Sequence, residues 1–268
     1  MSVDYLREAI DLARKGRSLA SPNPMVGAVL VRDGQVVGRG FHTWAGVKHA
    51  EILALEEAGE QARGATLYLN LEPCAHQGRT GPCADALIRA GIRRVVAPLT
   101  DPNPLVAGEG FRRLRAAGVE VEIDSTLAAE AEKLNEPFIH FMRTGRPLVT
   151  LKTALTLDGK IAAPDDNRGW ITSEKARLHV QQLRHDSDAI LTGIGTVLAD
   201  DCFLTDRTHL PRSRPLLRVV VDSQLRLPLD SRMVRGAQED LVVIGTSAAS
   251  ADRRRALESQ GVRVLAFD

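Results

Sequence analysis

The regular alternation of helix-like and strand-like segments constrains the fold of this chain most. Between residues 49 and 123, segments with apolar residues at helical spacing alternate with short runs rich in valine, isoleucine and leucine. This alternation is typical of a sheet covered by helices, because the connection between two parallel strands is usually a helix. The sequence therefore predicts an α/β fold.

The predicted elements begin with one helix and a hairpin. Leu6, Ile10 and Ala13 recur at helical spacing and predict a helix over residues 3–15. Asp33-Gly34 lies between two apolar runs and predicts antiparallel strands at 26–31 and 35–37. The segments that follow are predicted as helices at 49–58, 83–90 and 110–117 and strands at 65–71, 93–97 and 119–123.

A domain boundary is expected near residue 145, because the alternation pauses between residues 134 and 147. The chain is therefore divided into domains at 1–145 and 146–268. The second domain is predicted to contain helices at 173–184 and 248–260 and strands at 148–154, 189–192, 217–221, 241–244 and 262–266. Since it ends on a strand with no closing helix, we expect that a further piece of this domain is absent from the sequence.

Composition and charge exclude several classes of protein. The 35 Lys and Arg nearly cancel the 34 Asp and Glu, and only 10 of 268 residues are aromatic, which disfavours a nucleic-acid binder. No apolar run approaches the roughly 20 residues that span a bilayer, and the N-terminus lacks the order of a signal peptide. A cytoplasmic location is expected. Three cysteines are too few for a disulfide framework in a chain of this length.

One histidine and two cysteines are spaced like the ligands of a catalytic zinc ion. His49-Ala50-Glu51 is followed, after one predicted strand, by Pro73-Cys74 and then Cys83. Three protein ligands leave one position for a water molecule, whose pKa zinc lowers, and Glu51 can carry protons. His-x-Glu followed by Pro-Cys-x-x-Cys marks zinc base deaminases, although here eight residues separate the cysteines. His49 and Glu51 can face one metal only from the first turn of a helix.

Other interpretations of these and later residues stay open. The cysteines and His49 could be core residues without a metal, or a structural zinc site completed by His76. Cys202 has no partner pattern and is expected to be a buried thiol. Gly193 and Gly195 follow an apolar strand, where backbone N–H groups could meet a phosphate, but a complete Gly-x-Gly-x-x-Gly is lacking.

Four segments of the first domain together resemble a known family. They are Ser21-Pro22-Asn23-Pro24-Met25-Val26-Gly27, Gly38-Arg39-Gly40-Phe41-His42, His49-Ala50-Glu51 and Glu72-Pro73-Cys74-Ala75-His76-Gln77-Gly78-Arg79-Thr80-Gly81-Pro82-Cys83. They look like the deaminase half of the bifunctional riboflavin biosynthesis deaminase/reductases. The resemblance implies a three-layer α/β/α domain like that of cytidine deaminases. It also implies that His49, Cys74 and Cys83 hold zinc, that Glu51 carries protons, and that Asn23 and His76 contact the substrate.

The second domain resembles the reductase half of the same family, so that the resemblance covers essentially the whole chain. It implies an α/β fold like that of dihydrofolate reductase, with NADPH as the cofactor. The implied contacts are Ala154, Trp170, Thr196 and Asp200 to the cofactor and Arg184, Leu204 and Arg207 to the substrate, while Arg168 stands where a small hydroxyl residue is expected. The family continues with a Glu-Gly-Gly-type segment, which does not occur before Asp268. We therefore expect an incomplete second domain, with deamination retained and NADPH oxidation weak or absent.

The leading hypothesis is an enzyme of riboflavin biosynthesis. It would deaminate 2,5-diamino-6-(5-phosphoribosylamino)pyrimidin-4(3H)-one to 5-amino-6-(5-phosphoribosylamino)uracil and then reduce the ribosyl group to ribityl with NADPH. Its expected partner is this small phosphorylated pyrimidine, with no nucleic acid or membrane; a homo-oligomer is left open. The alternatives are a tRNA or nucleoside deaminase with an accessory domain, and a zinc-stabilised interaction module without catalysis.

Overall fold

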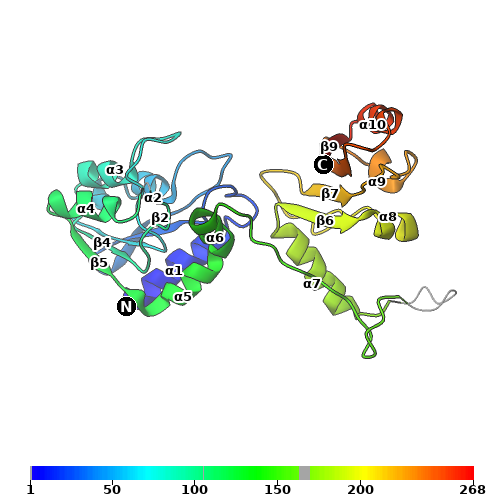
Figure 1. Cartoon of the computed structure of the whole chain (residues 1–268). Helices are drawn as coiled ribbons and strands as arrows, with labels where there is room; N and C mark the ends of the chain where they lie inside the picture. Colours follow the sequence, from blue (N-terminus) through cyan, green and yellow to red (C-terminus); the bar gives the residue numbers. More distant parts are fainter. Residues whose placement is uncertain (1, 105, 163–169) are drawn as a thin grey trace. The chain divides into compact units, whose positions relative to one another are not determined.

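The chain folds into two compact units, residues 1–151 and 152–268. The computed structural model (Figure 1) describes residues 2–104, 106–162 and 170–268. The boundary expected near residue 145 precedes the observed division by a few residues. No helix within these ranges is long and apolar enough to cross a membrane.

The first unit contains a five-stranded sheet with the order β2-β1-β3-β4-β5. Its strands are β1 (Gly27–Arg32), β2 (Gln35–Phe41), β3 (Thr66–Leu69), β4 (Arg94–Ala97) and β5 (Glu120–Ile123). β1 pairs antiparallel with β2 and with β3, whereas β3, β4 and β5 run parallel. Asp33 and Gly34 both have positive φ at the hairpin, as a tight two-residue turn requires, so the predicted hairpin is confirmed.

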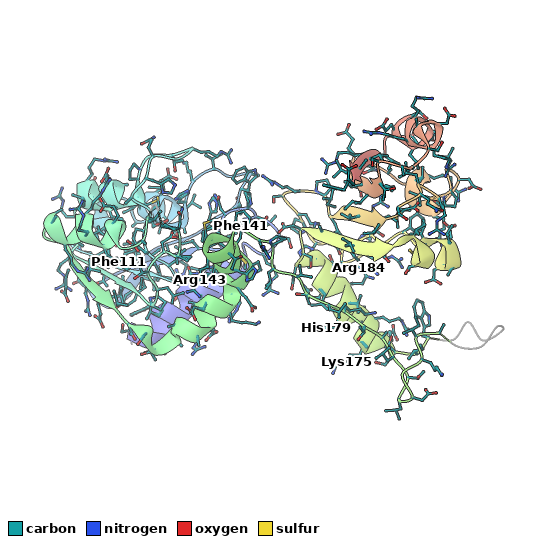
Figure 2. The ribbon with its side chains drawn as sticks, in the orientation of Figure 1. Phe111, Phe141, Arg143, Lys175, His179 and Arg184 are labelled. Carbon is teal, nitrogen blue, oxygen red and sulfur yellow. The ribbon has the colours of Figure 1, made fainter. Side chains whose placement is uncertain are left out.

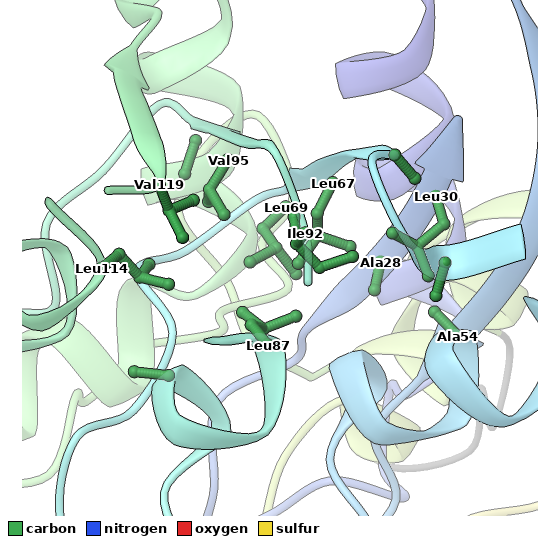
Figure 3. Close-up of a cluster of buried hydrophobic side chains, with 14 of the residues drawn as sticks. Ala28, Leu30, Ala54, Leu67, Leu69, Leu87, Ile92, Val95, Leu114 and Val119 are labelled. Atoms are coloured by element: carbon green, nitrogen blue, oxygen red, sulfur yellow. The ribbon is translucent and has the colours of Figure 1, made fainter. Parts of the chain in front are cut away.

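Helices cover both faces of this sheet, which gives the three-layer α/β/α arrangement. They are α1 (Ser2–Arg14), α2 (Ala50–Ala58), α3 (Cys83–Ala90), α4 (Glu109–Ala116), α5 (Ala128–Leu134) and α6 (Glu136–Thr144), with short 3₁₀ helices η1 (Gly59–Ala62) and η2 (Ser125–Leu127). Ala28 and Leu30 of β1 face a core shared with α2, α3 and α4 (Figure 3). Val29 and Val31 face the opposite core, shared with α1 and α5. Successive strand side chains point to opposite faces, so one short strand contributes to both cores.

Two glycines of β2 let the backbone of α2 pack directly against the backbone of the sheet. A Cβ at Gly40 would lie 2.1 Å from the carbonyl oxygen of Ala50, and one at Gly38 would lie 2.2 Å from that of Ala54. Neither position has room for a side chain. The close approach fixes the N-terminal end of α2, where His49 lies, against the sheet.

The region around the domain boundary agrees only in part with the predictions. The alternation of helices and strands pauses at 134–147 as expected, because this stretch contains the end of α5 and all of α6 with no strand between them, although neither helix was predicted. The strand predicted after it is wrong. Residues 148–154, predicted as a strand, form neither helix nor strand, and Val149 and Leu151 are 82% and 86% exposed. Apolar composition alone does not form a strand, because the backbone groups of a strand need a neighbour with which to hydrogen-bond.

The second unit contains a parallel four-stranded sheet with the order β6-β7-β8-β9. The strands are β6 (Ala189–Gly193), β7 (Leu217–Val221), β8 (Leu241–Thr246) and β9 (Arg263–Phe267), and the helices are α7 (Glu174–His185), α8 (Ile194–Asp200), α9 (Arg232–Arg235) and α10 (Ala251–Glu258). Residues of α8, α9 and α10 pack with Val220, Val243 and Val264 into one core. The sequence predicted these four strands and α7 and α10 but not α8 or α9.

Candidate active site

His49, Cys74 and Cys83 converge on one point in the first unit. The Nδ1 atom of His49 lies 3.2 Å from Sγ of Cys83 and 3.5 Å from Sγ of Cys74. A tetrahedral zinc ion, with ligand distances of about 2.0–2.3 Å, would separate its ligand atoms by roughly 3.5 Å, so the three residues fit zinc. Among the residues that the structure describes, these three form the group able to hold a metal, and His76 is not part of it.

The start of α2 places His49 and Glu51 together. His49 is the residue before the helix, with an extended backbone (φ −77°, ψ 160°), and its carbonyl accepts hydrogen bonds from the N–H groups of Ile52 and Leu53. Glu51 lies in the first turn. The expectation that both residues belong to a helix start is confirmed.

One cysteine lies after the end of a strand and the other at the start of the next helix. Cys74 follows β3 at the carboxyl edge of the sheet, and Cys83 is the first residue of α3. The backbone N–H of Cys83 donates to Sγ of Cys74 at 3.4 Å, so the start of the helix favours a thiolate there. Hydrogen bonds from the Cys83 thiol and the His49 ring lower the pKa of Cys74 to about 4, while the same contact raises the pKa of Cys83.

Glu51 is buried beside these ligands, with only 3% of the residue exposed. Burial raises the pKa of its carboxyl group to about 7, and the carboxyl also contacts the thiol of Cys83. A group that titrates near neutral pH can both accept and release a proton during a reaction. The structure therefore places beside the three converging residues a carboxyl group whose pKa suits proton transfer.

Asn23 and His42 lie next to the metal ligands. The side-chain amide of Asn23 is 3.0 Å from Nε2 of His42, whose Nδ1 is 3.0 Å from the carbonyl oxygen of Lys48. The ring of His42 stands edge-on to that of His49, with 5.1 Å between centroids. Burial lowers the pKa of His42, which favours the neutral imidazole.

Asp101 is a site residue that the sequence reasoning missed. It follows β4 at the same sheet edge as Cys74, and burial raises the pKa of its carboxyl group to about 6. The charges of Glu72 and Cys74 also raise this pKa, whereas the hydrogen bond from the backbone N–H of Asn103 and the charge of His76 lower it. The signal available in the sequence was Asp101-Pro102-Asn103, which begins four residues after the end of a buried strand. His76, the second implied substrate contact, is exposed within reach of the Asp101 charge.

In the second unit two of the three implied substrate residues, Arg184 and Arg207, lie close together. Arg184, near the end of α7 (Figure 2), donates from Nη1 to the carbonyl oxygen of Thr205 at 3.0 Å. Burial and the nearby charge of Arg207 lower the pKa of Arg184. Leu204, between them in the chain, has a positive φ of 53°. Two cations held close together form a place that suits an anion such as a phosphate.

The residues implied as cofactor contacts lie on different segments of the second unit. Thr196 and Asp200 are exposed and lie one turn apart on α8, and Gly193 and Gly195 lie at the start of this helix, directly after β6. Trp170 is 77% exposed and packs under the guanidinium of Arg177, 4.8 Å from the ring centroid. Ala154 lies in an irregular segment, and Arg168 lies outside the described residues. Cys202, expected to be buried, is half-buried against the core of this unit.

Comparison with known proteins assigns a family to each part of the chain. Residues 2–99 match the cytidine and deoxycytidylate deaminase zinc-binding region, and residues 147–268 match the RibD C-terminal domain. The chain is 44% identical over 262 residues to the riboflavin biosynthesis protein RibD of Aquifex aeolicus. This match covers 98% of the present chain and 72% of the Aquifex aeolicus protein.

Two solved structures resemble the whole chain. Acinetobacter baumannii RibD superposes with a TM-score of 0.89 at 45% identity and covers 100% of this chain and 74% of that one. A diaminohydroxyphosphoribosylaminopyrimidine deaminase/5-amino-6-(5-phosphoribosylamino)uracil reductase from Thermotoga maritima has a TM-score of 0.84 at 38% identity and covers 98% of this chain and 80% of that one. With a zinc-binding deaminase region in its first unit and the RibD C-terminal domain in its second, the chain belongs to the RibD family of riboflavin biosynthesis proteins.

Proposed function

We propose that residues 1–145 deaminate 2,5-diamino-6-(5-phosphoribosylamino)pyrimidin-4(3H)-one in the cytoplasm, and that residues 146–268 supply the NADPH-dependent reduction of the product. The first activity is supported by the three metal-ligand atoms within 4.8 Å of one another and by the buried carboxyl group of Glu51 beside them. The choice of substrate is supported by the name of the Thermotoga maritima relative, which covers both units of this chain.

In the deamination, His49, Cys74 and Cys83 would hold zinc. When bound, zinc would supply a water molecule acidic enough to act as a nucleophile near neutral pH. Glu51 takes a proton from the attacking water and delivers it to the leaving amino group, which departs as ammonia. Its pKa of about 7 suits both halves of this transfer.

Asn23, His42 and His76 bind and orient the pyrimidine in this proposal. Asn23 and His42 already hydrogen-bond to each other, and Lys48 holds the His42 ring through its backbone carbonyl, so the pair is rigid before substrate arrives. A preorganised polar pair reduces the entropy that binding must overcome.

In the second unit, Arg184, Leu204 and Arg207 would hold the ribose phosphate, and Ala154, Trp170, Thr196 and Asp200 would contact NADPH. A phosphate dianion would offset the burial and the repulsion from Arg207 that lower the pKa of Arg184. The guanidinium fork of each arginine can bond two phosphate oxygens at once.

Glu51→Gln tests the deaminase proposal. The variant keeps the size of the side chain but cannot carry the proton, so ammonia release from the pyrimidine should fall by at least about a hundredfold while bound zinc stays at the wild-type level. Glu56→Gln is the control, because Glu56 lies on the same helix, is exposed and forms an ion pair with Lys48 at the surface. Unchanged turnover in Glu51→Gln would support a structural zinc site or an interaction module instead.

A further inference from the structure

Glu72 is a buried carboxylate surrounded by backbone N–H groups. Only 3% of the residue is exposed. Its Oε2 accepts hydrogen bonds from the N–H groups of Asp101 and Gly108, both at 2.9 Å, and its Oε1 accepts one from the N–H of Phe111 at 3.1 Å. Three such bonds compensate the loss of water around a buried negative charge.

These three N–H groups belong to two separate pieces of structure. Asp101 follows the end of β4, whereas Gly108 and Phe111 (Figure 2) belong to the start of α4. The first N–H groups of a helix have no partner within the helix, and the helix dipole favours a negative charge at this end. Glu72 therefore acts as a cap for α4 that is supplied by the segment after β3, which is distant from α4 in the sequence.

The segment that carries Glu72 also carries a metal ligand. Glu72 is followed directly by Pro73 and Cys74. A Cβ at Gly110 of α4 would lie only 2.0 Å from the carbonyl oxygen of Pro73, so the helix start touches this segment with no room for a side chain. The hydrogen bonds and the glycine contact together lock Cys74 and Asp101 in one arrangement.

We propose that Glu72 is a positioning residue of the deamination site. This inference rests on the proposed function, because it gives Cys74 the role of a zinc ligand. Glu72 touches neither of the implied substrate contacts. It acts through the backbone, by fixing Asp101 on one side and the Pro73-Cys74 segment on the other at the carboxyl edge of the sheet.

The carboxylate is needed for its two acceptor oxygens. A glutamine in the same place has one carbonyl oxygen and one NH₂ group, so it can serve the pair Asp101 and Gly108 or the single N–H of Phe111, but not both. Whichever way the amide is turned, its NH₂ group would face at least one of these backbone N–H donors. Glu72→Gln therefore loosens one of the two attachments and leaves the fold otherwise intact.

The test compares full-length Glu72→Gln with the wild type and with Glu109→Gln. Glu109 is a carboxylate at the same helix start, but it accepts hydrogen bonds from the side chains of Arg112 and Arg113. We expect Glu72→Gln to lose about tenfold or more in kcat/KM of deamination and about tenfold in zinc affinity, measured by competition with a chelator. Glu109→Gln should match the wild type in both.

Amide hydrogen exchange gives a readout that does not need activity. In zinc-loaded Glu72→Gln, well below its unfolding temperature, the N–H groups of Asp101, Gly108 or Phe111 should exchange faster, while the N–H of Val95 in the centre of the sheet should not. A purely structural role would lower the unfolding temperature but leave kcat, KM and zinc affinity of the folded variant unchanged, and that result would overturn the proposal.

Two further outcomes also give a decision: a Glu72→Gln variant that does not fold, and a wild type that does not deaminate. If Glu72→Gln does not fold, Gly110→Ala serves as the second variant, because it disturbs the contact with Pro73 without altering the carboxylate; wild-type zinc affinity and kcat/KM in folded Gly110→Ala would overturn the proposal. If the wild type binds zinc but does not deaminate, the proposed function fails, whereas the effect of Glu72→Gln on zinc affinity still decides the inference.

Discussion

Asn135 binds the backbone of Met25 through both ends of its side-chain amide, although 110 residues separate the two. Its Oδ1 accepts from the N–H of Met25 at 2.8 Å, and its Nδ2 donates to the Met25 carbonyl at 2.9 Å. Asn70, fully buried after β3, donates to the same carbonyl. Met25 lies two residues after Asn23, so the junction of α5 and α6 helps to fix the segment that carries Asn23.

Asn135→Ala should destabilise the first unit. The change leaves the N–H of Met25 without its partner in a part-buried place, which costs about 1–3 kcal/mol. Urea unfolding monitored by circular dichroism would measure the loss. Gln61→Ala, at an exposed position of η1, is the control and should change the free energy of unfolding by less than about 0.5 kcal/mol. Equal stabilities for the two variants would contradict the role given to Asn135.

Cys83→Ser should remove most of the bound zinc. A serine hydroxyl is a poor substitute for a thiolate ligand, and only two ligands would remain in the group formed with His49 and Cys74. Metal analysis after dialysis should find about one zinc ion per chain in the wild type and far less in the variant. Cys202→Ser removes a thiol from the second unit and should retain the metal. A wild-type protein that purifies without a transition metal from metal-replete medium would refute the site.

Asp240→Asn should weaken the second unit in a pH-dependent way. Asp240 forms a two-pronged ion pair with Arg218, which is 1% exposed, at 2.7 and 2.8 Å. Burial works to raise the pKa of Asp240, but the guanidinium and backbone donors outweigh it, so that the pKa lies below its usual value of 3.8. Removing the charge would leave Arg218 buried without its partner and cost roughly 3 kcal/mol or more at neutral pH.

The sign of the pH effect follows from the lowered pKa. The unfolded state binds the proton more readily, so the stabilisation by Asp240 is present above pH 3.8 and is lost as the pH falls through the folded-state pKa. The difference in the free energy of unfolding between wild type and Asp240→Asn should therefore shrink below pH 3.8. A difference that stays constant between neutral pH and pH 3 would contradict a charged pair.

Arg207→Ala should weaken binding of a phosphorylated ribose in the second unit. Each charge-assisted hydrogen bond contributes about 1.5–3 kcal/mol, so the dissociation constant should rise by about ten- to a hundredfold. Calorimetric titration with ribose 5-phosphate measures this without requiring turnover. Arg235→Ala, an exposed arginine at the end of α9, is the matched control. If both variants bind ribose 5-phosphate with the same affinity, the phosphate does not bind at Arg207.

The sequence by itself determined the α/β class, the hairpin at Asp33-Gly34 and the three residues that converge into a group able to hold a metal. These features depend on local chemistry: the turn needs positive φ at two adjacent residues, and a thiolate, an imidazole and a carboxylate at this spacing serve few purposes besides metal chemistry. The helix starts at His49 and Cys83 were likewise predicted, since the apolar pattern begins at each of them.

Only the tertiary structure decided which distant groups complete the site. Glu72 stands in a segment that resembles the family, but its structural role has no signal in the sequence, and Asn135 has none either, because their partners are backbone groups that lie 29 to 39 and 110 residues away. The predicted strand at 148–154 failed for a related reason: a strand depends on a neighbour for its hydrogen bonds, and the local pattern of side chains does not say whether that neighbour is present.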